Sequence, residues 1–283
     1  MLYIVATPIG NMKDITLRAL EILENVDIIA AEDTRHTSKL LAHYNIKKPL
    51  ISYFEHNKIE RGPQLIARLL KGENIALVSD AGMPGISDPG EDLVKLCIEN
   101  NVEYTVCPGP VAGITALVLS GLSTGRFTFE GFLPEDKKKL SERLDYLKNT
   151  EVTTILYESP HNIIKTIKAF STFSENRTIV LCRELTKKFE EVKRGTAEEL
   201  LADFETNPPR GEYVVVVEGA KKGESSALID VSAEELYKEV CELISQGKSR
   251  NSAIKGAAEN FGIARNVAYD MYEEYYRTIK ESV

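Results

Sequence analysis

Short apolar runs alternate with amphipathic segments along most of the chain. In the first half, five runs are typical of buried strands: residues 2–7, 26–33, 49–54, 74–80 and 102–108. The segments between them carry apolar residues at helical spacing, as at Leu17, Leu20 and Leu23, for which Asp14 is the expected N-cap. This alternation predicts an α/β domain over residues 1–122, with a mainly parallel sheet and helices on its faces.

The pattern changes after a cluster of turn residues at 123–126, where we expect a domain boundary. Three further apolar strands and two helices follow, and the segment FEEVKRG at 189–195 indicates antiparallel pairing. Residues 123–220 are therefore expected to form a second α/β domain with a mixed sheet. A polar linker at 221–228 precedes a small helical unit at 229–283, in which three helical segments begin near Ser232.

Composition narrows the class of protein. Of the 283 residues, 43% are hydrophobic and 28% are charged, as in ordinary globular proteins. The four cysteines include no CxxC pair and the four histidines lack metal-ligand spacing, which favours a reducing cytoplasm and predicts no metal. We find no apolar run near the ~18 residues of a membrane span and no basic segment of a signal peptide, so a cytoplasmic protein without membrane contact is expected.

The net charge of -8 bears on the partners. Proteins that coat nucleic acid through phosphate contacts usually carry a basic excess, so any nucleic-acid contact here has to come from local patches. Charge alone favours an enzyme that acts on a small molecule.

Four unusual segments follow predicted strands of the first domain. They read TPIGN (7–11), AEDTRHT (31–37), SDAGMPGISDPG (79–90) and CPGPVAG (107–113). Ligands of open parallel sheets bind outside the carboxyl ends of the strands, so four such loops at one edge predict a ligand site. None is a P-loop or a GxGxxG turn, which excludes a P-loop NTPase and makes a conventional dinucleotide-binding fold a poor fit.

The order of these segments resembles a known family. Together with FEGFLP, YESPHNI, CRELTKKFEEVKRG and GEYVVVVEG, they are similar to the tetrapyrrole-methylase superfamily of S-adenosylmethionine-dependent methyltransferases, over residues 2–219. The most similar branch methylates the ribose 2′-hydroxyl of a cytidine in small-subunit ribosomal RNA. The porphyrin-making branch has Gly-Pro-Gly-Asp and Gly-Asp-Pro where this chain has TPIGN and Ser79-Asp80-Ala81, which argues against a tetrapyrrole substrate.

The resemblance implies that S-adenosylmethionine binds in the cleft between two α/β domains and that the chain forms a homodimer. By position in the motifs, it also implies a set of cofactor-binding residues: Pro8, Ser79, Asp80, Ala81, Met83, Val111, Ala112, Glu158 and Leu185.

A ribose hydroxyl is a weak nucleophile, so a base or a cation near it would help the reaction. Asp33 and His36 are candidate bases, and Arg35 is a candidate phosphate ligand. The structural alternative is that Asp33 caps the following helix. His161 and Arg183 are candidate substrate contacts. A histidine near a helix start is more often a local hydrogen-bonding residue, and an ion pair would explain Arg183 as well as a substrate contact would.

The C-terminal unit carries basic residues on a predicted helix-turn-helix pair, with the turn at 260–262. Lys248, Arg250 and Arg265 are candidate RNA contacts through the phosphate backbone. Charge alone leaves RNA binding and a packing or dimer role open, with Tyr269, Tyr272 and Tyr276 as core residues in the second case; the resemblance favours RNA.

These inferences predict an S-adenosylmethionine-dependent methyltransferase that acts on small-subunit (16S) ribosomal RNA, with the assembled 30S particle as the hypothetical substrate. Two alternatives stay open: a small-molecule methyltransferase of the same fold that acts on a corrin or porphyrin, and a non-catalytic ribosome-assembly factor.

Overall fold

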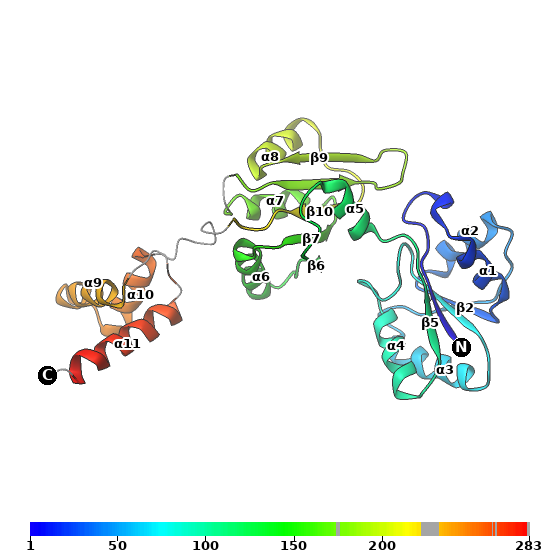
Figure 1. Cartoon of the computed structure of the whole chain (residues 1–283), viewed down its shortest axis with the longest axis horizontal. Helices are drawn as coiled ribbons and strands as arrows, with labels where there is room; N and C mark the ends of the chain where they lie inside the picture. Colours follow the sequence, from blue (N-terminus) through cyan, green and yellow to red (C-terminus); the bar gives the residue numbers. More distant parts are fainter. Residues whose placement is uncertain (174–175, 222–231, 262, 264, 282–283) are drawn as a thin grey trace. The chain divides into compact units, whose positions relative to one another are not determined.

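The computed structural model describes residues 1–173, 176–221, 232–261, 263 and 265–281 (Figure 1). The contacts divide the chain into two compact units, residues 1–147 with 152–219 and residues 148–151 with 220–283. Both sheets belong to the first unit. The predicted linker at 221–228 lies outside the described residues except for Lys221, and the predicted domain limits stay predictions.

The first sheet is fully parallel, with strand order β3-β2-β4-β1-β5. Its strands are β1 (Leu2–Val5), β2 (Ile28–Ala31), β3 (Leu50–Ser52), β4 (Ile75–Val78) and β5 (Tyr104–Cys107). The helices between them are α1 (Leu17–Asn25), α2 (Thr34–His43), α3 (Lys58–Leu70) and α4 (Gly90–Glu99). Every residue of β2 and β4 is buried, because apolar clusters pack on both faces of the sheet.

The start of α1 differs from the prediction. Thr16, not Asp14, is the N-cap, and its side chain accepts a hydrogen bond from the backbone N–H of Ala19 at 3.0 Å. Asp14 instead ends a short 3₁₀ helix, Met12–Asp14, whose own cap is Asn11. Both residue types cap helices well, so the extra turn of 3₁₀ helix decides which of them stands at the helix start.

The second sheet is mixed, with strand order β6-β7-β10-β8-β9. Its strands are β6 (Phe127–Phe132), β7 (Thr153–Glu158), β8 (Ile179–Arg183), β9 (Glu191–Gly195) and β10 (Tyr213–Val217). Only β6 and β7 pair in parallel; β9 runs antiparallel to β8, as predicted from its sequence. The two predicted sheet types are therefore confirmed.

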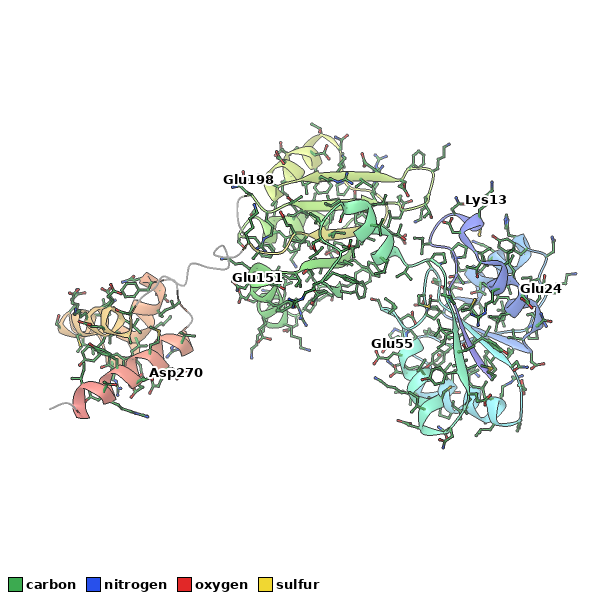
Figure 2. All side chains as sticks on the ribbon, in the orientation of Figure 1. Lys13, Glu24, Glu55, Glu151, Glu198 and Asp270 are labelled. Atoms are coloured by element: carbon green, nitrogen blue, oxygen red, sulfur yellow. The ribbon has the colours of Figure 1, made fainter. Side chains whose placement is uncertain are left out.

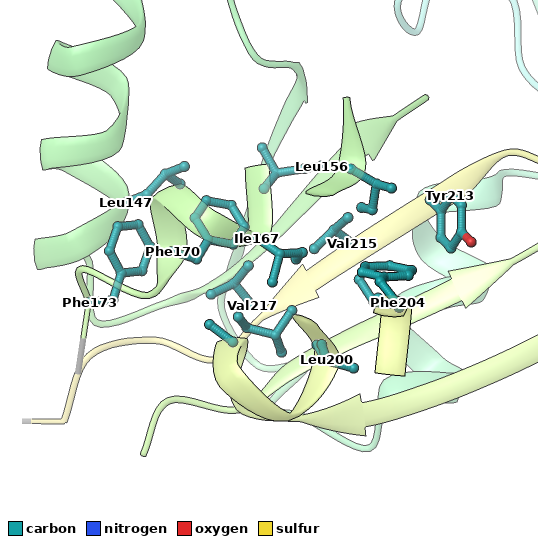
Figure 3. Packing of buried hydrophobic residues seen from close by; sticks show 14 residues of the cluster. Leu147, Leu156, Ile167, Phe170, Phe173, Leu200, Phe204, Tyr213, Val215 and Val217 are labelled. Atoms are coloured by element: carbon teal, nitrogen blue, oxygen red, sulfur yellow. The ribbon is translucent and has the colours of Figure 1, made fainter. Parts of the chain in front are cut away.

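Helices cover both faces of the second sheet. On one face, α6 (Lys137–Asn149), α7 (Ile163–Phe170) and α8 (Ala197–Thr206) enclose a core that includes Phe170, Phe204 and Val215 (Figure 3). On the other face lies α5 (Ala112–Ser120), which follows β5 of the first sheet and buries Ala116 and Leu117 against the second. The chain thus passes from the first sheet to the second through two consecutive elements, β5 and α5.

The second unit is a three-helix arrangement of α9 (Ala233–Ser245), α10 (Arg250–Asn260) and α11 (Arg265–Glu281). A capping box between Ser232 and Glu235 starts α9, and Leu236, Val240 and Ile254 are buried among the helices. Tyr272 is buried in this core, whereas Tyr269 and Tyr276 are exposed.

Charged side chains such as Lys13, Glu24 and Glu198 project into solvent (Figure 2). Within the described ranges, the structure has no helix of sufficient length and hydrophobicity to span a membrane.

Candidate functional site

The loops at the carboxyl ends of β1 and β4 are joined by backbone hydrogen bonds. The N–H of Thr7 donates to the carbonyl of Gly82 at 2.9 Å, and the N–H of Gly82 donates to the carbonyl of Thr7 at 3.1 Å. Gly82 has φ +82°, a conformation that L side chains rarely adopt. The two loops therefore form one continuous surface at this edge of the sheet.

The rest of the long loop after β4 closes on itself. The carboxylate of Asp88 accepts hydrogen bonds from the backbone N–H of Gly85, at 2.8 and 2.9 Å, and of Gly90, at 2.7 Å. A Cβ at Gly90 would lie 2.7 Å from the nitrogen of Gly85, so this approach requires glycine. The glycines, prolines and Asp88 of residues 79–90 thus form a compact, internally hydrogen-bonded ledge, which ends where α4 begins.

A cavity of about 380 Å³ opens beside this ledge, with residues of both sheets around it. The volume lies in the ordinary range of small-molecule sites. We define the first wall as the residues from the first sheet's loops and from the start of α5: Ile9, Ala81, Met83, Ile86, Val111 and Ala112. The second wall comes from the second sheet and its loops: Phe132, Tyr157, Glu158, Leu185, Lys187, Glu212 and Val214.

Six of the nine predicted cofactor residues line this cavity: Ala81, Met83, Val111, Ala112, Glu158 and Leu185. The other three support the loops. Pro8 follows the Thr7 bridge, the hydroxyl of Ser79 donates to the carbonyl of Ala81 at 3.3 Å, and Asp80 accepts from the N–H of Asp33 at 3.0 Å. The cofactor role of all nine stays a prediction.

The second wall contains a charged group that the sequence did not single out. The ammonium of Lys187 lies 3.0 Å from Glu184 Oε1 and 2.7 Å from Glu212 Oε2. Burial lowers the pKa of Lys187, but the hydrogen bonds to Glu212 and Glu184 outweigh it and raise this pKa above its usual value. Among the cavity-lining residues of the described chain, Lys187 is the only cation, and it stays protonated.

The turn that carries Lys187 has an unusual backbone. Glu184 and Thr186 have φ values of +50° and +63°, which are uncommon for residues other than glycine. Glu184 is held in place because its Oε1 also accepts from the N–H of Glu212 at 3.0 Å. These contacts direct Leu185 and Lys187 into the cavity.

The loops of the two sheets touch at this turn. The N–H of Asn11 donates to Thr186 Oγ1 at 2.9 Å. A Cβ on Gly10 would lie 2.4 Å from Cγ of Lys187 and 2.9 Å from the carbonyl oxygen of Leu185. The glycine in TPIGN therefore permits the contact that joins the first loop to the second wall.

Tyr157 forms a second link. Its hydroxyl accepts a hydrogen bond at 3.3 Å from the N–H of Gly113 in the first turn of α5, and burial raises the pKa of the phenol. The side chain of Glu158, next to it, is buried and accepts from Thr166 Oγ1 at 2.6 Å and from the N–H of Ser159 at 2.8 Å.

The three predicted catalytic residues lie at the start of α2, outside the cavity lining. Asp33 is the N-cap, accepting from the N–H of Arg35 at 2.8 Å, and it pairs with the guanidinium of Arg35 at 2.7 Å. The hydrogen bonds from Arg35 hold the pKa of Asp33 far below its usual value. His36 is exposed. The helix-cap interpretation of Asp33 is confirmed, and the catalytic roles of all three residues stay predictions.

Next to them, Glu32 is a half-buried carboxylate. Burial and the charges of Asp80 and Asp88 raise its pKa, against the lowering effect of the backbone N–H of Asp80.

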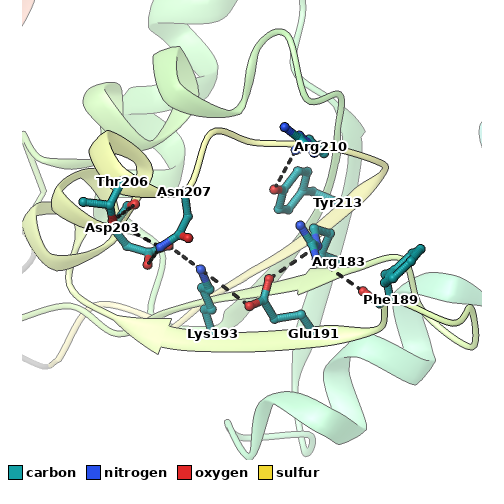
Figure 4. Close-up of polar contacts among 9 residues, drawn as sticks. All are labelled: Arg183, Phe189, Glu191, Lys193, Asp203, Thr206, Asn207, Arg210 and Tyr213. Carbon is teal, nitrogen blue, oxygen red and sulfur yellow. Dashed lines mark hydrogen bonds and ion pairs between the residues drawn. The ribbon is translucent and has the colours of Figure 1, made fainter.

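The predicted substrate residues are dispersed. His161 is exposed just before α7, and Arg183 pairs with Glu191 on the neighbouring strand at 3.3 Å (Figure 4). In the helical unit, Lys248 and Arg265 are exposed. Arg250 forms an ion pair with Glu273, and its guanidinium lies 5.0 Å from the ring centre of Tyr272 and 5.5 Å from that of Tyr276. Their RNA contacts stay predictions.

Comparisons with known proteins support the family. The model of the tetrapyrrole (corrin/porphyrin) methylases matches residues 1–201. The match to a cobalt precorrin-4 methyltransferase has a TM-score of 0.58 at 20% identity, over 77% of this chain and 94% of the other. The match to the methyltransferase CobJ has a TM-score of 0.59 at 18% identity, over 77% and 94%. The chain belongs to the tetrapyrrole methylase family, as the sequence motifs indicated.

Full-length relatives narrow the comparison within this family. The chain is 46% identical to the ribosomal RNA small subunit methyltransferase I of Synechocystis, over 96% of both chains. It is 43% identical to the protein of the same name from Bacillus subtilis, over 96% of this chain and 94% of the relative.

Proposed function

We propose that the chain is an S-adenosylmethionine-dependent methyltransferase that modifies small-subunit ribosomal RNA at the ribose 2′-hydroxyl of a cytidine. The observation that carries the proposal is the full-length similarity to proteins named for this RNA, at 46% identity. The two solved methyltransferases compared above are only 18% and 20% identical to this chain, and the higher identity to the RNA-named relatives favours RNA over a corrin or porphyrin as the substrate.

The residues of the cavity fit this cofactor. Apolar side chains of the first wall, such as Met83 and Val111, suit an adenosine and a thioether chain, and Gly82 lines the cavity beside them without a side chain. Val111, the N-cap of α5, makes no side-chain cap hydrogen bond. The backbone N–H groups at the start of this helix, apart from that of Gly113 which donates to Tyr157, are therefore open to a carboxylate. The bound cofactor would supply an activated methyl group on its sulfonium.

The chain itself has to orient the ribose and to stabilise the charge that develops on its oxygen. Lys187 places a cation at the cavity, and ion pairs with Glu184 and Glu212 hold its ammonium in position. We infer that this ammonium stabilises the developing alkoxide. Asp33 and His36 stay as alternative groups for proton transfer, and Arg35 stays as an alternative phosphate ligand. All three would act only if the substrate contacts the start of α2.

The test uses labelled S-adenosylmethionine and small ribosomal subunits from cells that lack the protein. Because a 2′-O-methyl group blocks alkaline cleavage at its own linkage, hydrolysis is expected to release one labelled alkali-resistant dinucleotide. Label on a base, or only on a small molecule, would contradict the proposal. Tight cofactor binding without transfer to any acceptor would support the non-catalytic assembly factor.

We further propose that the substrate is the assembled 30S particle in the cytoplasm, where such particles are made. The net charge of -8 supports this, because a preformed particle can present the ribose without a broad basic surface on the enzyme. Equal kcat/KM on naked transcripts and on subunits would overturn the proposal.

Local basic residues would then supply the phosphate contacts. The exposed Lys248 and Arg265 of the helical unit are proposed RNA contacts, together with His161 in the first unit. Arg183 and Arg250 are proposed with them, although each is already engaged in an ion pair. A K248A/R265A variant is expected to weaken subunit binding and to reduce its salt dependence, without changing cofactor affinity.

An exposed apolar surface supports a homodimer. Ile114 and Val118 on α5 are 45% and 70% exposed, and Phe127 and Phe129 on β6 are 41% and 37% exposed. The two elements adjoin, since a Cβ on Gly113 would lie 3.6 Å from the ring of Phe129. Light scattering should give twice the chain mass for the wild type and a monomer for V118E. A monomeric wild-type protein would contradict this proposal.

A further inference from the structure

The β8–β9 hairpin ends in an exposed aromatic side chain. Phe189 is 65% exposed, whereas Phe170, Phe173 and Phe204 of the same sheet's core are each 7% exposed or less. It lies in the turn Lys187–Glu190, which closes with a hydrogen bond of 3.1 Å from the N–H of Glu190 to the carbonyl of Lys187. The ring of Phe189 therefore presents a large apolar surface to a partner.

Hydrogen bonds and an ion pair fix the backbone of this turn, although the ring of Phe189 is exposed. Arg183 pairs with Glu191 at 3.3 Å, and its Nη2 reaches the carbonyl of Phe189 at 3.5 Å (Figure 4). On the other side of the turn, the N–H of Thr186 donates to the carboxylate of Glu190 at 2.6 Å. Binding a partner at Phe189 would therefore cost little ordering of the backbone.

The same turn forms part of the cavity. Leu185 and Lys187 line it, and Phe189 follows Lys187 by two residues, which span at most about 7 Å of chain. An RNA strand whose ribose reaches Lys187 would pass Phe189 with an adjacent nucleotide.

The surroundings of the ring suit a nucleotide better than an apolar partner. The ammonium of Lys188 lies 5.6 Å from the ring centre, and Lys188 follows directly after the cation of the cavity. A lone aromatic ring with a lysine beside it combines a stacking surface with a phosphate ligand, as in proteins that bind single-stranded nucleic acid. A protein partner would call for a wider apolar patch.

We propose that the turn Lys187–Glu190 is a docking element for single-stranded RNA, in which Phe189 stacks on an unpaired base next to the methylated nucleotide and Lys188 pairs with a neighbouring phosphate. The proposal rests on the proposed function and adds the surface that holds the strand. In this arrangement Arg183 is a positioning residue for the turn.

The sequence offers a direct probe, because the chain contains no tryptophan. An F189W variant carries a single indole at the proposed contact. L70W is the matched control, because Leu70 at the end of α3 is 63% exposed. Adding small subunits, with cofactor present, is expected to quench the emission of F189W through stacking on a base, and to leave L70W unchanged.

Kinetics give the second readout. F189A is expected to raise KM for subunits roughly 5- to 100-fold, while kcat and cofactor affinity stay within about twofold; F189W restores KM and L70A leaves it unchanged. K188A is expected to raise KM less and to lower its salt dependence.

The two failures are distinguishable. Absence of methyl transfer by the wild type overturns the proposed function. Normal wild-type transfer, together with an unchanged KM in F189A or an unquenched F189W that still methylates subunits, overturns the docking element alone.

Discussion

The two walls of the cavity are built in different ways. The first wall depends on backbone: the Thr7–Gly82 bridge and the Asp88 loop fix a surface of small and apolar residues. The second wall depends on side-chain charge, with Lys187 held between Glu184 and Glu212. Backbone and apolar surface suit a cofactor of fixed shape, whereas a fixed cation suits an oxygen that gains charge during the reaction. We infer that the first wall supplies most of the cofactor contacts, whereas Lys187 of the second wall acts on the oxygen that receives the methyl group.

Removing the cation of the second wall should have the largest effect. K187M is expected to lower kcat on the order of 100-fold, the usual cost of one group that stabilises an oxyanion, while cofactor affinity changes by less than about threefold. Single-turnover methylation and calorimetric titration of cofactor measure the two quantities separately.

K187R should recover part of the lost kcat, because the arginine side chain keeps the positive charge but carries it on a planar guanidinium of different shape. Lys71, exposed after the end of α3, supplies the control K71M, for which wild-type kinetics are expected. A K187M variant that loses cofactor affinity as strongly as kcat would show that both walls serve binding, and the contrast between them would fail.

The contact between the two walls requires a glycine at position 10. A methyl group there tests whether cofactor binding and methyl transfer both depend on this contact. G10A places Cβ within 2.9 Å of the carbonyl oxygen of Leu185, and overpacking of this kind typically costs about 1–3 kcal/mol. Cofactor affinity and kcat are both expected to fall, by roughly tenfold, as the turn shifts away from the first loop. Isothermal titration and steady-state assays provide the measurement.

The control for this change is G125A, because a Cβ at Gly125 would meet no atom within 4 Å. It should leave both quantities at their wild-type values. If G10A behaves like G125A, the contact between TPIGN and the β8–β9 turn contributes nothing to the site.

The contrast between the walls also explains what the sequence could predict. The first wall follows from local motifs: glycines, prolines and Asp88 within residues 79–90 already indicate a shaped loop at a strand end. The alternating strands and helices likewise follow from apolar periodicity. Local signals failed where two equal caps compete, as at Asp14 and Thr16.

The second wall could not be predicted in the same way. Lys187 and Glu212 are 25 residues apart, and they meet because β8 and β10 pair with Arg183 opposite Tyr213. A one-residue change in that register would separate them. Because β8 and β10 are buried on both faces, their sequences carry no polar–apolar alternation from which the register could be predicted. The positive φ values of Glu184 and Thr186 were also invisible, since neither residue is a glycine.

The smallest effect is expected at Asp33, the N-cap of α2, whose backbone N–H donates to Asp80 in the loop beside the first wall. Asn caps helices about as well as Asp, so D33N should keep the fold and methylate subunits at close to the wild-type rate, whereas D33A should lower Tm by about 2–4 °C. Because hydrogen bonds from Arg35 depress the pKa of Asp33, its contribution to stability is present above pH 3.8 and is lost as the pH falls toward the depressed value. Thermal unfolding at pH 7 and below pH 4 should therefore show a weaker acid sensitivity in D33N. If D33N instead abolishes methyl transfer with cofactor affinity intact, Asp33 is the base, and the chemistry is not confined to the second wall.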